Sequence, residues 1–263
     1  MRSRYPSLVV TLGLVLGAPL TSIAQTTVTR SVQTTGARDR ARAPYNVGLE
    51  NMHAEAWDEA VKSFRSAIEI DPTFEMAFYM LGRANMGQKK YADAIGAYEK
   101  CRDLYRAQVG RQFTNAQERQ RDRETRLREI DEVIRSYQAS PQTLQIQDAI
   151  RQLQNQRREL DEALKRGNTT MTLETSVPAY VSTSLGSAYF RSGRLQDAER
   201  EYKAAIAADA KAGEAYSNLA VVYMETGRIG DAEKSVKLAE KVGFKVHPQL
   251  KEDIKNRRKA GSL

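Results

Sequence analysis

The stretch LGSAYFRSGRLQDAEREYKAA, residues 185–205, decides the fold, because its pattern is repeated further along the chain. Thirty-four residues later, at 219–239, the sequence reads LAVVYMETGRIGDAEKSVKLA. The matching positions are Leu185 and Leu219, Gly186 and Ala220, Tyr189 and Tyr223, Gly193 and Gly227, Ala198 and Ala232, and Ala205 and Ala239. A fixed period of this size is typical of stacked structural repeats.

The same 34-residue step occurs nearer the N-terminus. The matching positions there are Gly48 and Gly82, Ala60 and Ala94, Phe64 and Tyr98, and Ala67 and Cys101. Two antiparallel helices joined by a tight turn explain the spacing, because small residues let the helices approach and large ones fill the remaining volume. Gly193 and Gly227 suit the left-handed conformation that ends many helices. Pro72 ends the first unit, since proline cannot continue a helix.

These residues resemble the tetratricopeptide repeat family, most closely at 58–64, 185–189 and 193–198. The resemblance implies an all-α fold of helical hairpins at 41–74, 75–108, 179–212 and 213–246, arranged as two pairs of repeats (41–106 and 179–246). Asn51 and Asn85 depart from the pattern, because an aromatic residue usually stands there.

The chain between the two pairs is longer than the period allows by 70 residues. Two degenerate repeats would fill that length, but residues 111–139 contain no Gly or Pro, which favours one long helix. Apolar positions on the two sides of residue 140 mirror one another, which predicts an antiparallel coiled-coil hairpin over 107–166. The predicted layers are Ile134 with Ile146, Ile130 with Ile150, Leu127 with Leu153, Gln120 with Leu160, and Ala116 with Leu164.

Arg123 and Arg157 would share one layer of this hairpin, so we expect both side chains to turn outward toward acidic neighbours. The acidic neighbours within reach are Glu124, Glu159 and Asp161. Three roles for the hairpin stay open: a rigid spacer, a second contact surface, or an arm for homo-oligomerisation.

The two ends of the chain carry their own signals. Arg2 and Arg4 precede an apolar run at 8–20, and small residues follow, which predicts a signal peptide over 1–24 and an exported, periplasmic or secreted protein. We expect a disordered segment at 25–40 and a polar linker at 167–178. At 247–263 we expect a capping helix and tail, in which Leu250 and Ile254 cover the open end of the stack.

Site chemistry is sparse in the sequence. The two histidines, His53 and His247, lie far apart, and Cys101 is the only cysteine, so neither a metal site nor a disulfide is predicted. Phosphate-binding loops and nucleophile motifs do not occur. We therefore expect no catalytic residues, no cofactor and no enzymatic activity. The net charge of +8 is compatible with peripheral contact with an anionic envelope surface, but does not by itself indicate nucleic acid.

In the family that the repeats resemble, the first helix of each hairpin lines a concave groove that holds a protein or peptide. Carried onto this chain, the groove residues are Tyr45, Leu49, Met52, Tyr79, Arg83, Met86, Tyr180, Thr183, Phe190, Ser217, Val221 and Met224. Because the insertion separates the two pairs, we expect a split groove. The resemblance implies a non-catalytic scaffold or adaptor that binds a protein partner in this groove. The alternative is an envelope-structure protein that holds anionic lipid or polymer through its basic surface, for which residues 251–259 are the best candidate.

Overall fold

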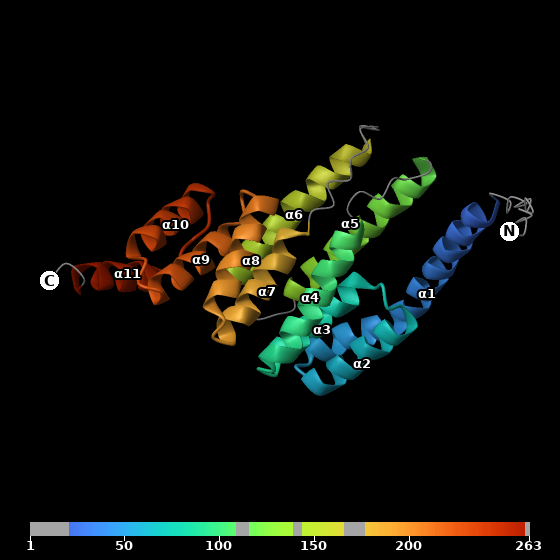
Figure 1. The fold of residues 1–263 in the computed structure, drawn as a ribbon, viewed down its shortest axis with the longest axis horizontal. Helices are drawn as coiled ribbons and strands as arrows, with labels where there is room; N and C mark the ends of the chain where they lie inside the picture. The colour runs from blue at the N-terminus through green and yellow to red at the C-terminus, as the bar shows by residue number, and fades with distance from the viewer. Residues whose placement is uncertain (1–20, 109–115, 139–143, 166–176, 261–263) are drawn as a thin grey trace, which may run out of the picture.

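The chain forms helices throughout the part that the structure, a computed structural model, describes: residues 21–108, 116–138, 144–165 and 177–260. Those residues contain no strand, so the predicted all-α class is confirmed. The helices are α1 (Thr21–His53), α2 (Trp57–Ile70), α3 (Glu75–Gly87), α4 (Tyr91–Gln108), α5 (Ala116–Gln138), α6 (Leu144–Lys165), α7 (Ala179–Arg191), α8 (Leu195–Ala208), α9 (Gly213–Glu225), α10 (Ile229–Lys241) and α11 (Pro248–Ala260). Figure 1 shows them stacked in an elongated array from α1 and α2 at one end to α11 at the other.

Four helical hairpins make up the stack, as the 34-residue period predicts. The hairpins are α1–α2, α3–α4, α7–α8 and α9–α10, and each packs on the next. Gly193 and Gly227 have φ angles of 82° and 76°, which confirms their place in left-handed turns after a first helix. In the first two hairpins, Glu55 and Lys89 take up this conformation instead, with φ angles of 54° and 60°.

Glycine in the first helix makes room for an aromatic ring of the second. A Cβ atom on Gly48, Gly82 or Gly186 would lie only 2.6–2.7 Å from a ring carbon of Phe64, Tyr98 or Tyr202, respectively. All three rings are at most 2% exposed. In the fourth hairpin the ring is replaced by Val236, and the glycine is replaced by Ala220. The repeat interior is therefore a matched pair of positions sixteen residues apart.

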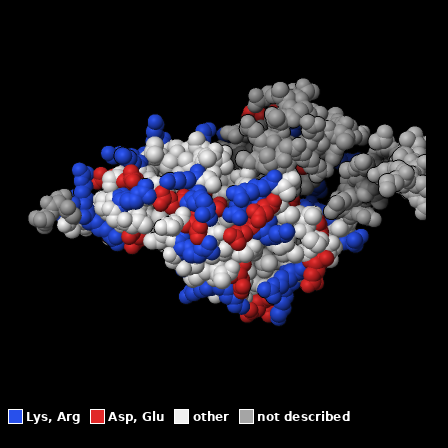
Figure 2. All heavy atoms as spheres, viewed as in Figure 1, with Lys and Arg blue, Asp and Glu red and all other residues white. Residues whose placement is uncertain are grey.

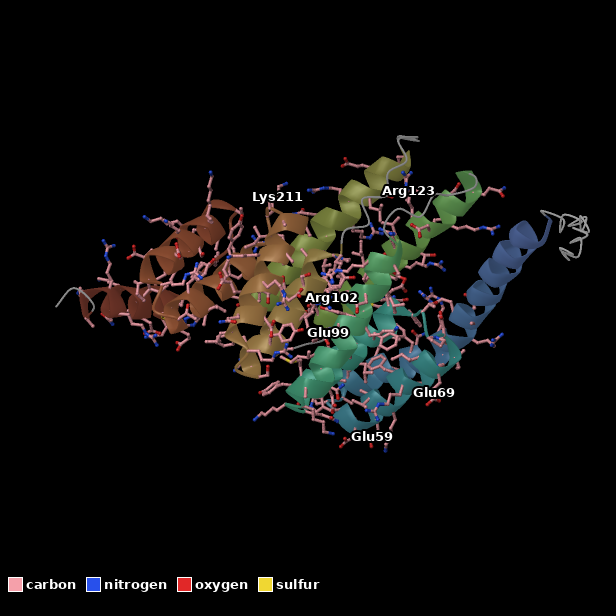
Figure 3. The ribbon with its side chains drawn as sticks, in the orientation of Figure 1. Glu59, Glu69, Glu99, Arg102, Arg123 and Lys211 are labelled. Carbon is pink, nitrogen blue, oxygen red and sulfur yellow. The ribbon has the colours of Figure 1, made fainter. Side chains whose placement is uncertain are left out.

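The stack continues directly from the second hairpin to the third, so the expectation of a split groove is wrong. Helix α7 packs on α4 even though the insertion separates them in sequence. The Tyr105 and Tyr180 hydroxyls are 3.2 Å apart. Arg102 Nη1 lies 2.8 Å from Glu201 Oε1, where α4 meets α8. Figure 3 shows Arg102 and Glu99 on the part of α4 that faces α7 and α8. The insertion therefore leaves the line of repeats and rejoins it without a gap.

The insertion contains the two predicted helices, α5 and α6, which pack against each other side by side (Figure 1). The predicted turn at residue 140 lies outside the described residues. Ile130, Ile134 and Leu153 of the predicted layers are at most 7% exposed and belong to the main hydrophobic core. Arg157 binds Asp131 of α5, a partner that was not expected, with Nε 2.6 Å from Oδ1. The hydrogen bond to Asp131, and also the charge of Asp161, one of the expected neighbours, raise the pKa of Arg157.

The N-terminal segment differs from its prediction, because residues 25–40, expected to be disordered, lie within α1. The segment contains no proline, and Arg38 near its end is held by ion pairs. Most of the predicted signal peptide, and most of the linker at 167–178, fall outside the described residues. No helix among the described residues is long and apolar enough to cross a membrane. At the other end α11 packs on α10, with Leu250 and Ile254 buried as predicted for a cap.

Candidate functional site

The candidate site is the first-helix surface, which we define as the side of the stack formed by α1, α3, α7 and α9. All of the predicted groove residues lie on these four helices. Those that are buried are Tyr45, Met52, Tyr79, Thr183, Ser217 and Met224. Those that are half-buried are Leu49, Arg83, Met86, Tyr180, Phe190 and Val221. What covers the buried part of this surface is the first question about its function.

Helix α5 of the insertion contacts the part of the first-helix surface that α1 and α3 form. Arg38 of α1 is the central group, and its guanidinium binds three carboxylates at once. Asp71 and Glu75 come from the loop before α3 and from α3 itself, with Nη2 of Arg38 2.8 Å from the Glu75 carboxylate. Glu129 comes from α5, with its Oε1 3.4 Å from Nη1 of Arg38. One arginine thus joins the first hairpin, the second hairpin and the insertion.

A second ion pair lies one helical turn further along both helices. Arg42 Nη1 is 3.0 Å from Oε1 of Glu132, which is only 5% exposed. Tyr45 follows on the same side of α1 and is fully buried. Burial and then the negative charge of Glu132 raise the pKa of Tyr45 well above its ordinary value, so the phenol stays neutral. The α1 side of the contact is therefore two cations followed by a neutral ring.

The α3 side of the contact centres on the Tyr79 hydroxyl, which meets two other helices. It lies 2.8 Å from the Tyr137 hydroxyl on α5 and 3.1 Å from Ser184 Oγ on α7. Arg83 Nη1 donates a hydrogen bond of 2.6 Å to Ser136 Oγ, and its guanidinium lies 4.3 Å above the ring of Tyr137. These contacts hold the C-terminal end of α5 against the junction of the second and third hairpins.

Glu129 is the electrostatically unusual group of this interface. It is 7% exposed and shares Arg38 with the carboxylates of Asp71 and Glu75. Burial, and then the nearby charge of Glu75, raise the pKa of Glu129 to about 8, and Arg38 offsets only part of that shift. Although burial opposes it, hydrogen bonds from Thr73 and Arg38 lower the pKa of Asp71. At neutral pH one arginine therefore faces carboxyl groups with opposite tendencies to ionise.

Sequence reasoning missed the residues of α5 that make this contact, and it also missed Arg38 and Arg42. The predicted layers placed only Ile130 and Ile134 among the inward-facing residues of this part of α5. The structure adds Val133, fully buried, and Tyr137, 9% exposed, on a second face of the helix. An apolar residue followed by an aromatic one four positions later, outside the predicted seam, was the available signal.

The third and fourth hairpins use their predicted residues differently. The Thr183 hydroxyl donates 2.8 Å to the carbonyl of Ala179 within its own helix. The carbonyl of Met224 accepts a hydrogen bond of 2.8 Å from Arg257 of the capping helix. Helix α6 packs against α9, so the insertion also contacts this half of the surface. Phe190 and Val221 remain half-buried.

Several basic side chains of the C-terminal helix α11 form ion pairs within the molecule. Lys251, Arg257 and Arg258 of α11 pair with Glu240, Glu225 and Glu233, at distances of 2.8–3.0 Å. On the face that Figure 2 shows, basic and acidic side chains are interspersed over this end of the stack. The alternative of an anionic lipid or polymer ligand therefore has less support than the contacts of the first-helix surface provide for protein binding.

The described residues contain no group of three or more His, Cys, Asp or Glu side chains that could hold a metal ion. The continuous stack of helical hairpins, with a capping helix at its end, defines the protein as an α-helical repeat solenoid. The tetratricopeptide repeat family matches residues 54–108 and 183–241, which cover parts of all four hairpins. The chain therefore contains tetratricopeptide repeats, as the residues of the 34-residue period predict.

Solved structures that match the chain do so at low sequence identity. PilW, described as a widely conserved type IV pilus biogenesis factor, is 16% identical and has a TM-score of 0.38, over 82% of this chain and 85% of its own. A thermophilic protein of the family in Thermus thermophilus is 19% identical and has a TM-score of 0.31, over 85% of this chain and 100% of its own. YrrB, described as having an unusual peptide-binding site, is 15% identical, with a TM-score of 0.28, over 88% of this chain and 98% of its own. No curated protein matches the sequence.

Proposed function

We propose that this protein is an exported, non-catalytic scaffold that binds a protein partner through its first-helix surface. Proteins built from tetratricopeptide repeats typically mediate protein–protein interactions. The observation that carries the proposal is the contact between this surface and α5, because residues 129–137 of that helix meet α1 and α3 through side-chain contacts. A surface that accepts one helix in this way has the chemistry needed to accept another.

The part of the surface beyond the α5 contacts supports the same proposal. Leu49, Met86, Phe190 and Val221 are half-buried apolar residues on four successive first helices. Leu49 and Val221 occupy one position of the repeat, and Met86 and Phe190 occupy the position three residues later on the same helical face. Apolar side chains on successive helices suit an extended or helical segment of a partner, and methionine adapts to different shapes. We therefore expect a partner bound on the first-helix surface to contact these residues as well.

Export is the second part of the proposal and rests on the sequence. Arg2, Arg4 and the uncharged run at 8–20 have the form of a signal peptide, with Ser22 and Ala24 spaced for cleavage. Fractionation of the native host, followed by N-terminal sequencing, checks this. An envelope or secreted location and a mature chain that starts at Gln25 are the expected results, and a cytoplasmic chain that begins at Met1 would refute export.

Photo-crosslinking in intact cells tests the binding surface. A photoreactive amino acid placed at Met86 in the full chain lies on the first-helix surface, whereas the same group at Lys100 lies on an exposed position of the second helix α4. We expect Met86 to capture a defined protein that Lys100 does not capture. Identical products from the two positions, or no product from Met86, would contradict the proposal.

A further inference from the structure

Helix α5 runs along α1 in a fixed register rather than crossing it. Arg38 pairs with Glu129, and Arg42, one turn further along α1, pairs with Glu132, almost one turn further along α5. The next contact along α5 is Ser136, with Arg83 of α3. Partners that advance together along both helices show that α5 lies parallel to the first helix, along the groove.

The two sides of this contact are complementary in charge. The stack contributes Arg38, Arg42 and Arg83, and α5 contributes Glu129 and Glu132. Glu132 is 5% exposed, and the cation of Arg42 that faces it offsets the cost of burying its charge. Glu129 is 7% exposed and accepts a hydrogen bond from Arg38, although its raised pKa favours the protonated form. The surface thus carries a pattern that selects acidic helices and disfavours basic ones.

Opening of the contact would expose the apolar Val133 and the ring of Tyr137 as well as the ion pairs. The polar groups that α5 buries would be solvated by water if α5 moved away, so the desolvation cost of the ion pairs is recovered on release. Ile130 and Ile134 lie on a different side of α5 from Glu129 and Glu132, at the positions predicted to face α6. Release from the first-helix surface therefore leaves the α5–α6 contact in place.

We propose that α5 is an internal ligand of the first-helix surface, and that the protein partner presents an acidic amphipathic helix of the same pattern, which must displace α5 to bind. The pattern is two acidic residues about one turn apart, then a β-branched apolar residue, then an aromatic residue with a hydroxyl group, as in Glu129, Glu132, Val133 and Tyr137. This inference rests on the proposed function, because it names the partner chemistry and the regulation of the same surface.

A labelled synthetic peptide of residues 116–138 tests the proposal with the full chain. In the wild-type chain α5 competes with the peptide, and the apparent affinity falls with the fraction of molecules whose surface is open. In the variant Glu129→Lys with Glu132→Lys, the new lysines face Arg38 and Arg42, so α5 should leave the surface. We expect this variant to bind the peptide about tenfold or more tightly than the wild-type chain does, measured by fluorescence anisotropy.

Two controls separate displacement from a general charge effect. The variant Glu124→Lys with Glu162→Lys makes the same change of charge at exposed positions of α5 and α6, and should bind the peptide no better than the wild-type chain. A peptide that carries the two lysines itself should bind neither chain. We call the variant Glu129→Lys with Glu132→Lys the swapped chain, and Glu124→Lys with Glu162→Lys the control chain. Equal binding of the native peptide by the swapped, control and wild-type chains would overturn the proposal.

Hydrogen exchange over residues 127–138 decides the remaining outcomes. Faster exchange in the swapped chain, with the helix content of the repeats retained, is the expected result. Unchanged exchange would show that the ion pairs do not hold α5, and global unfolding of both the swapped chain and a Tyr137→Ala chain would show that α5 is part of the core. Either result overturns the proposal. Failure of the peptide test leaves the photo-crosslinking result intact, whereas absence of a crosslinked partner removes the scaffold function itself.

Discussion

The two pairs of repeats are alike inside and different outside. The first pair, α1–α4, and the second pair, α7–α10, both place an aromatic ring against a glycine, as Tyr98 does with Gly82 and Tyr202 with Gly186. On the first-helix surface the first pair presents charged groups and tyrosines to α5. In the second pair the Thr183 hydroxyl bonds within its own helix, and the backbone carbonyl of Met224 accepts a hydrogen bond from the capping helix. The repeat period therefore specifies the interior, while the outer surface of each pair is free to specialise.

The largest expected effect tests the shared interior. Tyr98→Ala and Tyr202→Ala each remove a ring that is 2% exposed, and each should lower the free energy of unfolding by about 3–5 kcal/mol. Urea denaturation followed by circular dichroism measures both, with the exposed Lys100→Ala as a control expected to stay within about 0.5 kcal/mol of the wild-type chain. A loss in only one pair would show that the two interiors are not equivalent.

A smaller effect tests the matched positions directly. Gly82→Ala places a Cβ atom about 2.6 Å from the Tyr98 ring and should cost about 1–3 kcal/mol of stability. Gly96→Ala on α4 meets no atom within 4 Å and should be neutral or stabilising, because alanine favours helix. Adding Tyr98→Val to Gly82→Ala copies the Ala220 and Val236 pair of the fourth hairpin. That second change should cost less in the Gly82→Ala chain than in the wild-type chain, and equal costs would argue against coupling.

The next prediction concerns only the first pair and uses pH. The pKa of Glu129 is raised to about 8 when α5 is bound, so the bound state holds a proton that the released state gives up. Binding of α5 should be strongest below the ordinary pKa of a glutamate and should weaken as the pH rises toward 8. Protection factors for residues 127–138 should therefore fall between pH 5.5 and 8.5, where Asp71 stays ionised.

Glu129→Gln provides the matched control for that experiment, because glutamine resembles the protonated carboxyl group. Protection in this variant should change little between pH 5.5 and 8.5, and exchange in α9 should be insensitive to pH in both chains. An equal fall in protection in the glutamine variant would show that another group causes the pH dependence.

The smallest effect compares the turns of the two pairs. Lys89 has a φ angle of 60° where Gly227 has 76°, and only glycine adopts this conformation without strain. Lys89→Gly should stabilise the chain by about 0.5–1 kcal/mol, and Gly227→Ala should destabilise it by a similar amount. Thermal unfolding of the two variants gives the signs, and two changes of the same sign would contradict the comparison.

The sequence predicts the repeats well, because the residues that pack inside each hairpin lie at fixed, short separations along the chain. Gly48, Gly82 and Gly186 stand sixteen residues before the rings that need them, so one period reveals the packing. The hairpin of the insertion is also visible, since a seam of apolar residues such as Ile130 and Ile134 repeats along a helix.

Docking of α5 could not be predicted in the same way. Arg38, Arg42, Glu129 and Glu132 are the residue types that ordinarily lie in water on helix surfaces, and no spacing relates residue 38 to residue 129. The helix over residues 25–40 was not expected for the same reason, since Arg38 acquires its partners only when distant parts of the chain meet. The predicted groove residues lie on the first helices of the hairpins, but the local spacing gives no signal that α5 covers part of them.

The direct packing of α7 on α4 has a consequence for how such a chain can change over generations. Four residues, 71–74, join α2 to α3, and four more, 209–212, join α8 to α9. The α4–α7 junction keeps the same kind of contact although a far longer segment connects it. An inserted segment between α4 and α7 could therefore be gained, exchanged or lost in evolution while the packing of the hairpins on either side stays the same. The regulatory helix and the array that it covers can therefore evolve at separate rates.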